Sequence, residues 1–410
     1  MTMDDLKAPS MRETIERLPG SKIREVANAG LGRSDVLAFW FGESDEVTPA
    51  AVRDAAAQSL MQGETFYSHN LGLAELRDAL RSYTAALHGD PGADRIAVTS
   101  SGVTALMLAM QLLVDAGSQV VVVTPVWPNL PAQPAILGAD VRRVALAPDA
   151  HGTWRLDLDR LLAAITPATR VLLVNSPNNP TGWTLTRTEQ RALLDHCRRT
   201  GTWIVADEVY ERIWFGAGVP ADAPASAAPA TTAAPSFLDL ATPDDRVIAV
   251  QSFSKSFLMT GWRLGWLVLP RGHLDAMGKL IEFNSSCAPV FVQRGALAAL
   301  AGADRSVPEL VGRLRHCRDR LCAALAGLPG VRVATPPGGL YAFLKVPGAD
   351  DSLAFAKHLV TAHGLGLAPG AAFGTEGEGW LRWCFASRDP ARLDQGVARL
   401  RAALRLPDPR

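Results

Sequence analysis

Seven short apolar runs that alternate with helical patterns, from about residue 95 onward, constrain the fold most strongly. The runs are rich in β-branched residues and read RIAVTS, QVVVVTP, ADVRRVAL, TRVLLVNSP, TWIVADEVY, DRVIAVQSF and RLGWLVLP. Amphipathic stretches such as 103–117 and 187–201 lie between them, and Gly201 ends the second as at a helix C-terminus. Apolar strands separated by helices predict an α/β fold with a mostly parallel seven-stranded sheet covered on both faces.

Two other regions differ from this alternating pattern. After about residue 290, helical patterns are followed by the short strands YAFLKV and WLRWCFAS and by a final helix, which predicts a second, smaller α+β domain. Residues 216–235 are nearly all Ala, Pro, Gly, Ser and Thr. Because this composition cannot bury a core, we expect a low-complexity insertion exposed on the surface.

The charge balance of the chain excludes several classes of protein. Lys plus Arg and Asp plus Glu number 41 each, so the basic excess of a nucleic-acid or anionic-membrane binder is missing. No apolar run reaches the roughly 18 residues that span a bilayer. The first twenty residues also lack the apolar core of a secretory signal. We therefore expect a cytoplasmic protein without nucleic-acid or membrane partners.

Cysteine and histidine usage predicts neither a disulfide framework nor a metal site. The five cysteines never form a CxxC pair, and the eight histidines show no HExxH motif. No Cys/His cluster has the spacing of metal ligands, so we expect no metal ion.

The segment QSFSKSFLMTGWRLGW carries the most informative lysine. Lys255 follows a strand of the buried type, where an ammonium group is uncommon. Ser252 and Ser254 flank it, and Arg263 follows between two glycines. Hydroxyls, a guanidinium and glycines that allow close backbone approach are a typical phosphate-binding set. Lys255 would then contact that anion directly or form a Schiff base with a phosphorylated aldehyde.

A carboxylate and a phenol end the strand pattern TWIVADEVY. Asp207 could simply cap the next helix. Alternatively, it could bond a protonated pyridine nitrogen while Tyr210 donates to a phenolate oxygen. Pyridoxal phosphate needs both contacts, since its cationic ring stabilises a carbanion at the substrate Cα.

Three further segments follow strands and admit two interpretations each. Residues 101–104 would present free N–H groups at a helix N-terminus, an anion site, although small residues begin many helices. Asn179 in NSPNNPTGW is either part of a turn or within reach of a ring oxygen. Trp127 in TPVWPN either stacks on a planar ring or packs in the core.

Arg382 lies inside the apolar strand pattern GWLRWCFAS. A charge so placed needs a carboxylate partner, and a bidentate contact with a substrate α-carboxylate would provide one. Tyr67 and Gly42 are uninformative when taken singly.

Taken together, these motifs resemble one family. NNPTG, DEVY, SFSKSF, MTGWRLGW, GLAELR, PPGGLYAFLKV, LAPGAAFG and LRWCFA resemble the class I/II pyridoxal-phosphate aminotransferases of fold type I, the aspartate-aminotransferase-like group, over about residues 35–400. The resemblance implies a homodimer with active sites between the subunits. It also implies a large cofactor domain over 46–289 and a small domain built from 1–45 and 290–410.

The resemblance assigns roles around the cofactor ring. Lys255 would form the aldimine and then carry the proton between the substrate Cα and the cofactor. Asp207 would pair with the pyridine nitrogen, and Tyr210 and Asn179 would hold the 3-oxygen. Trp127 would stack on the ring.

The same resemblance assigns the phosphate and the substrate. Residues implied to bind the phosphate are Gly102, Val103, Thr104, Ser252 and Arg263, with Tyr67 reaching the cofactor of the neighbouring subunit. Arg382 would bind the substrate carboxylate, and Gly42 and Asn179 would lie beside the substrate. Val103 stands where some aspartate-preferring relatives have a lysine, and Trp40, Phe41 and Trp127 would make the pocket aromatic.

The reaction implied is a ping-pong transfer of an amino group from an L-amino acid to a 2-oxo acid. The alternative on the same carbanion is a lyase, decarboxylase or oxidase, because the substrate pose decides which Cα bond breaks. A Ser–Lys hydrolase would fit SxxK at 252–255 but lacks the companion motifs. A nicotinamide dehydrogenase would need a GxGxxG turn that is missing. A DNA-binding regulator would need more than the roughly 35 residues that precede the resemblance.

Overall fold

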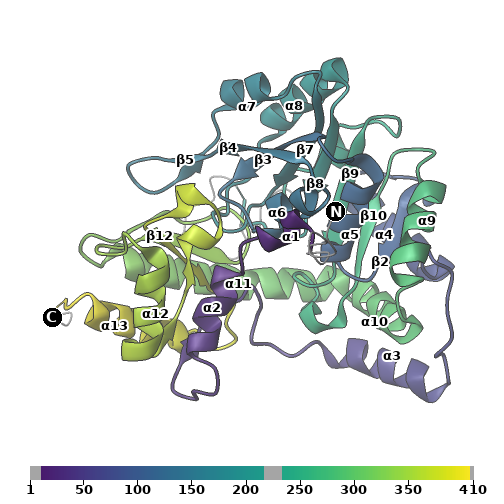
Figure 1. The fold of residues 1–410 in the computed structure, drawn as a ribbon. Coiled ribbons are helices and arrows are strands. Elements are labelled where there is room, and N and C mark those ends of the chain that lie inside the picture. Colours follow the sequence, from purple (N-terminus) through teal and green to yellow (C-terminus); the bar gives the residue numbers. More distant parts are fainter. Residues whose placement is uncertain (1–10, 217–232, 407–410) are drawn as a thin grey trace, which may run out of the picture.

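A seven-stranded sheet organises the larger part of the molecule (Figure 1). The computed structural model describes residues 11–216 and 233–406. In spatial order the strands are β2 (Ile96–Thr99), β10 (Gly265–Val268), β9 (Val247–Ser252), β8 (Trp203–Asp207), β7 (Thr169–Asn175), β3 (Gln119–Thr124) and β4 (Asp140–Ala145). All pairs are parallel except the two made by β10. Each apolar run forms one strand, so the predicted sheet is confirmed.

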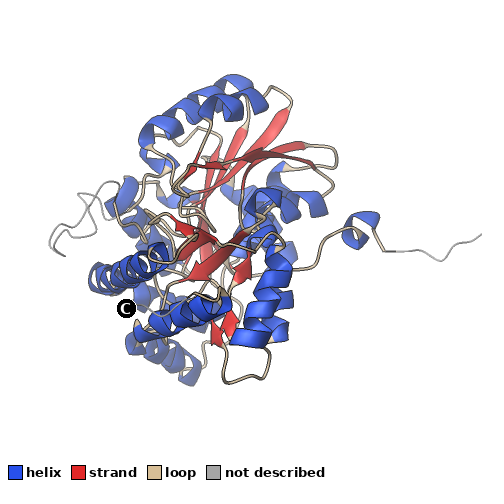
Figure 2. Cartoon of the chain, turned by 90° about the vertical axis from the view of Figure 1, so that its left-hand side faces the viewer, coloured by secondary structure: helices blue, strands red, loops and turns tan. Residues whose placement is uncertain are grey.

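Helices cover both faces of this sheet, as Figure 2 shows with strands in the middle and helices outside. They are α4 (Ala74–His88), α5 (Gly102–Leu113), α6 (Asn129–Ile136), α7 (Leu158–Ala164), α8 (Arg187–Thr200), α9 (Leu274–Ser285) and α10 (Val290–Ala301), and α3 (Ala50–Met61) packs against α10. The valines of β3 alternate between two cores: Val121 and Val123 face one, and Val120 and Val122 face the other. Burying each such side chain stabilises the fold by about 1.5–3 kcal/mol, which explains the near-continuous apolar runs.

Local signals set the ends of α8. Thr186 and Glu189 form a reciprocal capping box at its start, and Gly201 adopts the left-handed conformation at its end (φ 76°). A glycine accepts this conformation without the penalty of a Cβ. The predicted C-terminus is therefore confirmed.

A second, four-stranded sheet is built from the C-terminal part of the chain. Its order is β11 (Arg332–Val333), β12 (Tyr341–Lys345), β15 (Trp380–Cys384) and β14 (Ala368–Pro369). The helices of this region are α11 (Ala303–Ala326), α12 (Ser352–His363) and α13 (Ala391–Ala403). Short elements elsewhere are α1 (Glu13–Glu16), β5 (Ala147–Pro148) and β6 (Trp154–Arg155).

The N-terminal segment packs against this C-terminal region. Helix α2 (Lys22–Ala29) lies beside α12 in Figure 1, and the two helices are in contact. Strand β1 (Leu37–Ala38) pairs in parallel with β13 (Leu365–Gly366). The segment after β1 is thereby brought to the edge of the large sheet.

The division at residue 289 stays a prediction, and α10 bears on it. This helix begins just after that boundary but packs against α3 and against α4, a helix that contacts β2 of the large sheet. Most of the low-complexity insertion, 217–232, lies outside the described residues. Its last part differs from the expected surface exposure, because Ala233 and Ala234 are buried and the Ala234 N–H donates to the Glu211 carbonyl at 2.8 Å. No helix in the described part of the chain is long and apolar enough to cross a membrane.

Candidate active site

A cavity of about 460 Å³ lies where the large-sheet strands end and meet the segment after β1 and strands β12 and β15. The predicted residues that line it are Gly42, Gly102, Val103, Trp127, Asn179, Asp207, Tyr210, Ser252, Lys255, Arg263 and Arg382. Residues separated by up to 340 positions thus surround one space, as expected for a parallel sheet whose strands end at one edge.

The amine of Lys255 is poised for nucleophilic or basic chemistry. Its Nζ donates to the Gly42 carbonyl at 2.6 Å. Burial, together with the nearby Arg382 and Arg263 charges, lowers the pKa of this amine to about 8. An appreciable fraction of the amine is therefore unprotonated near neutral pH, and that is the form that attacks carbonyls or accepts protons.

The buried carboxyl group of Asp207 receives little stabilisation of its negative charge. It is the last residue of β8 and is 2% exposed. Burial raises the pKa of its carboxyl to about 7, although the Val209 N–H and the Lys255 charge act in the opposite direction. The Val209 N–H donates to Oδ1 at 3.4 Å, a long contact. A cationic group entering the cavity would stabilise the ionised form of this acid.

A chain of polar contacts joins Tyr210 to the second sheet. The hydroxyls of Tyr210 and Tyr341 lie 2.7 Å apart, and the guanidinium of Arg382 lies 4.4 Å from the Tyr341 ring centroid. Tyr341 also explains Gly42: a Cβ at position 42 would lie 2.0 Å from the Tyr341 hydroxyl oxygen. Tyr341 belongs to the PPGGLYAFLKV motif, yet it was not singled out, because a tyrosine in an apolar strand is also an ordinary core residue.

Arg382 is a buried cation on β15 with incomplete partners. Nη1 donates to Asn179 Oδ1 at 2.9 Å, and Nη2 donates to the Trp40 carbonyl. Nε is buried and has no hydrogen-bond partner among the described residues. The guanidinium also lies 4.9 Å from the Phe373 ring centroid. A carboxylate ligand would supply the missing acceptor and the opposite charge.

The small residues at the start of α5 allow very close packing with β10. A Cβ on Gly265 would lie 2.6 Å from the Gly102 nitrogen. Ser252 Oγ donates to Ser254 Oγ at 3.0 Å, and Arg263 Nη1 donates to the Thr260 carbonyl at 2.6 Å. Hydroxyls, a guanidinium and a helix N-terminus together form an anion-binding surface.

Three predicted residues do not line the cavity. Trp40, which was expected to make the pocket aromatic, is 7% exposed and packs in the hydrophobic core instead. The N–H of Thr104 donates to Ser101 Oγ at 3.0 Å, because Ser101 is the N-cap of α5, so this N–H is not free as expected. Tyr67 is 89% exposed. These positions do not contradict the other assignments, but the expected contact of the Thr104 N–H with an anion and the expected place of Trp40 in the pocket have no support in this geometry.

Several residues that line the cavity escaped the sequence analysis. They are Ile23, Arg24, Glu43, Leu106, Asn175, Val209, Thr260 and Tyr341. Arg24 lies at the start of α2, with its guanidinium 5.5 Å from the Phe41 ring centroid. A basic residue on a short amphipathic helix resembles any solvated surface charge, so no local pattern marks it.

Comparison with known proteins identifies the family of the chain. A family model described as aminotransferase class I and II matches residues 35–400. The chain belongs to the class I and II aminotransferases. An aspartate aminotransferase of Pyrococcus horikoshii is 29% identical over 396 residues, which is 96% of each chain. An arginine–pyruvate transaminase of Pseudomonas aeruginosa is 32% identical and covers 85% of each chain.

A solved structure supports the same assignment. A single mutant of Thermus thermophilus aspartate aminotransferase matches with a TM-score of 0.85 at 27% identity, over 96% of this chain and 99% of that chain. This aminotransferase therefore has the expected fold and acts as a transaminase on amino acids and 2-oxo acids. The lyase, decarboxylase or oxidase alternative is not favoured.

Proposed function

We propose that this aminotransferase binds pyridoxal 5′-phosphate in the cavity and links it covalently to Lys255. The observation that carries the proposal is that a lysine amine and a buried carboxylate, which forms no ion pair among the described residues, open onto the same cavity. When bound, the cofactor supplies an aldehyde and an electron-withdrawing pyridinium ring.

The residues present fit this cofactor. The protonated ring nitrogen would form an ion pair with Asp207. This pairing would stabilise the ionised carboxylate and keep the ring protonated. Ser252 and Arg263 are available to the phosphate, beside the N-terminal turn of α5 with Gly102 and Val103. Tyr210 and Asn179 would hold the 3-oxygen, and Trp127 would pack on the ring.

Lys255 would serve twice. Its Nζ would hold the cofactor through the aldehyde that the cofactor supplies. When the Nζ is free and the amino donor is bound, it would accept the proton from the donor's Cα and later return it. The pKa of about 8 suits a base that works near neutral pH.

Arg382 would orient the donor through its α-carboxylate. Its partner Asn179 and the Tyr341 ring hold the guanidinium at one end of the cavity. The aromatic Phe41 and Trp127 and the charged Arg24 and Glu43 line the rest of the cavity. Because both aromatic and charged side chains line the cavity, we infer that the side chain of the amino donor makes both apolar and charged contacts. A panel of amino donors against 2-oxoglutarate and pyruvate will identify the substrates.

A homodimer is part of the proposal. The exposed Tyr67 would reach the cofactor phosphate of a neighbouring subunit. A cytoplasmic location is proposed with it.

Borohydride reduction of the holoenzyme tests the covalent link. Reduction followed by peptide mass analysis should place the cofactor mass on the Lys255 peptide. In Lys255→Ala this peptide should carry no cofactor mass, and the transfer rate should fall at least about 10³-fold. Substitution of the exposed Lys279 by Ala should leave the labelled Lys255 peptide and the transfer rate unchanged. An unmodified Lys255 peptide in an enzyme that transfers amino groups would overturn the proposal.

A further inference from the structure

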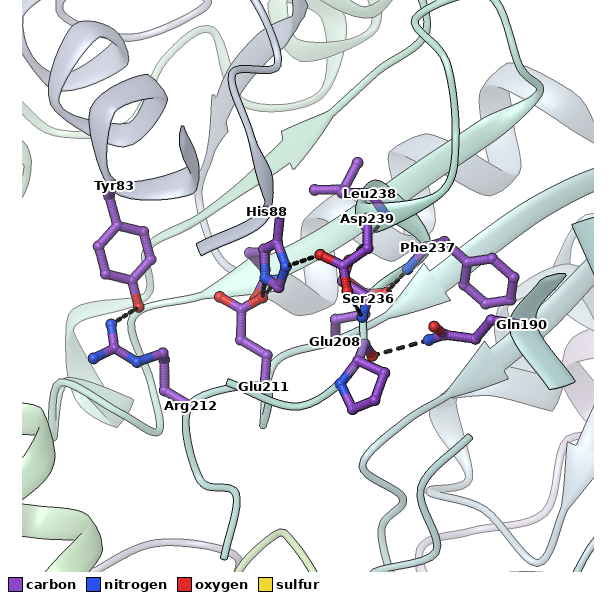
Figure 3. A network of polar contacts seen from close by, with 12 residues as sticks. Tyr83, His88, Gln190, Glu208, Glu211, Arg212, Ser236, Phe237, Leu238 and Asp239 are labelled. Atoms are coloured by element: carbon purple, nitrogen blue, oxygen red, sulfur yellow. Dashed lines mark hydrogen bonds and ion pairs between the residues drawn. The ribbon is translucent and has the colours of Figure 1, made fainter. Parts of the chain in front are cut away.

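A second polar cluster is centred on His88 and contains Glu208, Glu211, Ser236 and Asp239 (Figure 3). His88, the last residue of α4, has its ring between two carboxylates: Nδ1 is 2.8 Å from Asp239 Oδ1 and Nε2 is 3.0 Å from Glu211 Oε2. Its side chain is 3% exposed. No residue of this cluster lines the cavity, and the transfer reaction described above uses none of them.

Strand alternation explains why the cluster backs onto the active site. Successive side chains of a strand point to opposite faces. Asp207 faces the cavity and Glu208 faces the cluster. On the neighbouring β9, Ser252 lines the cavity while Gln251 donates from Nε2 to Glu211 Oε2 at 2.6 Å.

The cluster fixes the turn that follows Asp207. The Oε2 atom of Glu211 accepts hydrogen bonds from His88 Nε2 and Gln251 Nε2. The backbone carbonyl of Glu211 accepts a hydrogen bond from the Ala234 N–H. The Glu208 N–H donates to the Val250 carbonyl at 3.0 Å, which extends the pairing of β8 with β9 past Asp207. His88 therefore joins α4, the 207–212 turn and the segment 233–239 at one point.

The groups that face His88 favour its protonated form. Glu211 and Glu208 come from the turn after β8, and Asp239 comes from the short helix Phe237–Asp239. Farther out, Arg187 of α8 binds the second oxygen of Asp239 at 2.9 Å. Arg212 donates to the Tyr83 hydroxyl on α4 at 3.1 Å. The contacts of Asp239 and Glu211 raise the pKa of His88 to about 10, although burial acts in the opposite direction.

We propose that His88 is a positioning residue for the transfer reaction: through Glu211 and Gln251 it holds the ends of β8 and β9, and so keeps Asp207 and Lys255 in place. This inference rests on the proposed function of those two residues. His88 itself touches neither the cavity nor a reacting group. Residues that orient a functional group in this way commonly alter activity by one to two orders of magnitude.

The test compares His88→Gln with Arg187→Gln in the loaded holoenzyme. Arg187→Gln is the matched control, because it removes the exposed outer ion pair of Asp239 and leaves the His88 bridge intact. For His88→Gln we expect kcat per loaded site to fall about tenfold with KM changed by less than about twofold. We also expect the pH midpoint of the cofactor's visible absorbance to move by about half a unit or more. The control should match the wild type in all three readouts.

Glu211→Gln provides the second variant in case His88→Gln fails to fold. This substitution keeps the shape of the side chain and removes its charge. We therefore expect a smaller fall in kcat and a smaller shift of the absorbance midpoint than for His88→Gln. A lower melting temperature with unchanged kcat and absorbance midpoint would show a merely structural role and overturn the inference. Failure of the proposed function is distinguishable, because the wild type itself would then show no cofactor absorbance.

Discussion

Buried polar groups at the ends of β8 and β9 differ in their hydrogen bonding between the side that faces the cavity and the side that faces the cluster. Toward the cavity, Asp207 has a long contact with the Val209 N–H. Toward the cluster, Glu208 accepts from Ser236 Oγ at 2.6 Å and from the Phe237 N–H at 3.1 Å. Because buried polar groups are normally paired, a group that is left poorly paired marks the place where a ligand completes the structure.

Two buried arginines show the same contrast. Arg318 on α11 forms an ion pair with Asp319 at 2.6 Å and donates to the Pro336 carbonyl at 3.1 Å, while it packs on Phe215. Arg382 also packs on aromatic rings, but in the described part of the chain it forms no ion pair and leaves Nε without an acceptor. The charge of Arg318 is thus paired within the fold, whereas Arg382 is the cation that we propose to bind a substrate carboxylate.

The largest effect is expected on the cavity side. Asp207→Asn removes the charge that would keep the cofactor ring cationic, so kcat/KM should fall about 10²–10³-fold, as for the loss of a preorganised electrostatic partner. Steady-state kinetics with saturating cofactor measures the change. A variant within about threefold of the wild type would show that Asp207 does not act on the ring.

On the cluster side, the main effect should be on stability. His88→Gln leaves two buried carboxylates facing an uncharged group, which should cost about 3 kcal/mol of unfolding free energy. The folded-state pKa of His88 is raised from 6.5 to about 10, so its contribution is full below about pH 6.5 and is lost as the pH rises through 10. Denaturant unfolding at pH 6 and pH 9.5 should therefore show a difference between variant and wild type that shrinks with pH. A constant difference would contradict the ionic role.

Asp207 should carry a stability cost in the apoenzyme. Its folded-state pKa is raised from 3.8 to about 7, so the folded chain loses stability as the pH rises between these values. Asp207→Asn should stabilise the apoenzyme by about 2 kcal/mol at pH 8 and leave it unchanged near pH 3.5. Calorimetry of the cofactor-free protein measures this, and a destabilised variant at pH 8 would refute the explanation.

The smallest effect is expected for Glu208→Gln. Burial, together with the nearby Glu211 charge, raises the pKa of Glu208 to about 8, so the carboxyl is mostly neutral at pH 7 and an amide can replace it. We expect a change in unfolding free energy and in activation free energy of less than about 0.5 kcal/mol each. A large loss of activity would mean that the cluster side contributes a charge to the reaction.

The sequence predicted the large sheet and most of the cavity because both depend on local patterns. Strand runs ending in Asp207, or leading to Lys255, place their side chains at one sheet edge by topology alone. Arg24 and Tyr341 were missed because their place in the cavity depends on how the N-terminal segment and the second sheet pack. His88 was missed for a related reason. Its partners Glu211 and Asp239 come from distant segments, and no sequence spacing indicates that the three residues are in contact.

The pairing of β1 with β13 sets an order of events in the biosynthesis of the enzyme. The Phe39 N–H donates to the Gly366 carbonyl at 2.8 Å, and the Phe39 carbonyl accepts the Cys384 N–H at 3.1 Å. Gly42, just beyond, supplies the carbonyl that binds the Lys255 amine. Because β13 and β15 lie late in the chain, a nascent polypeptide on the ribosome lacks them, and we expect this wall of the pocket to form only after nearly the whole polypeptide has emerged.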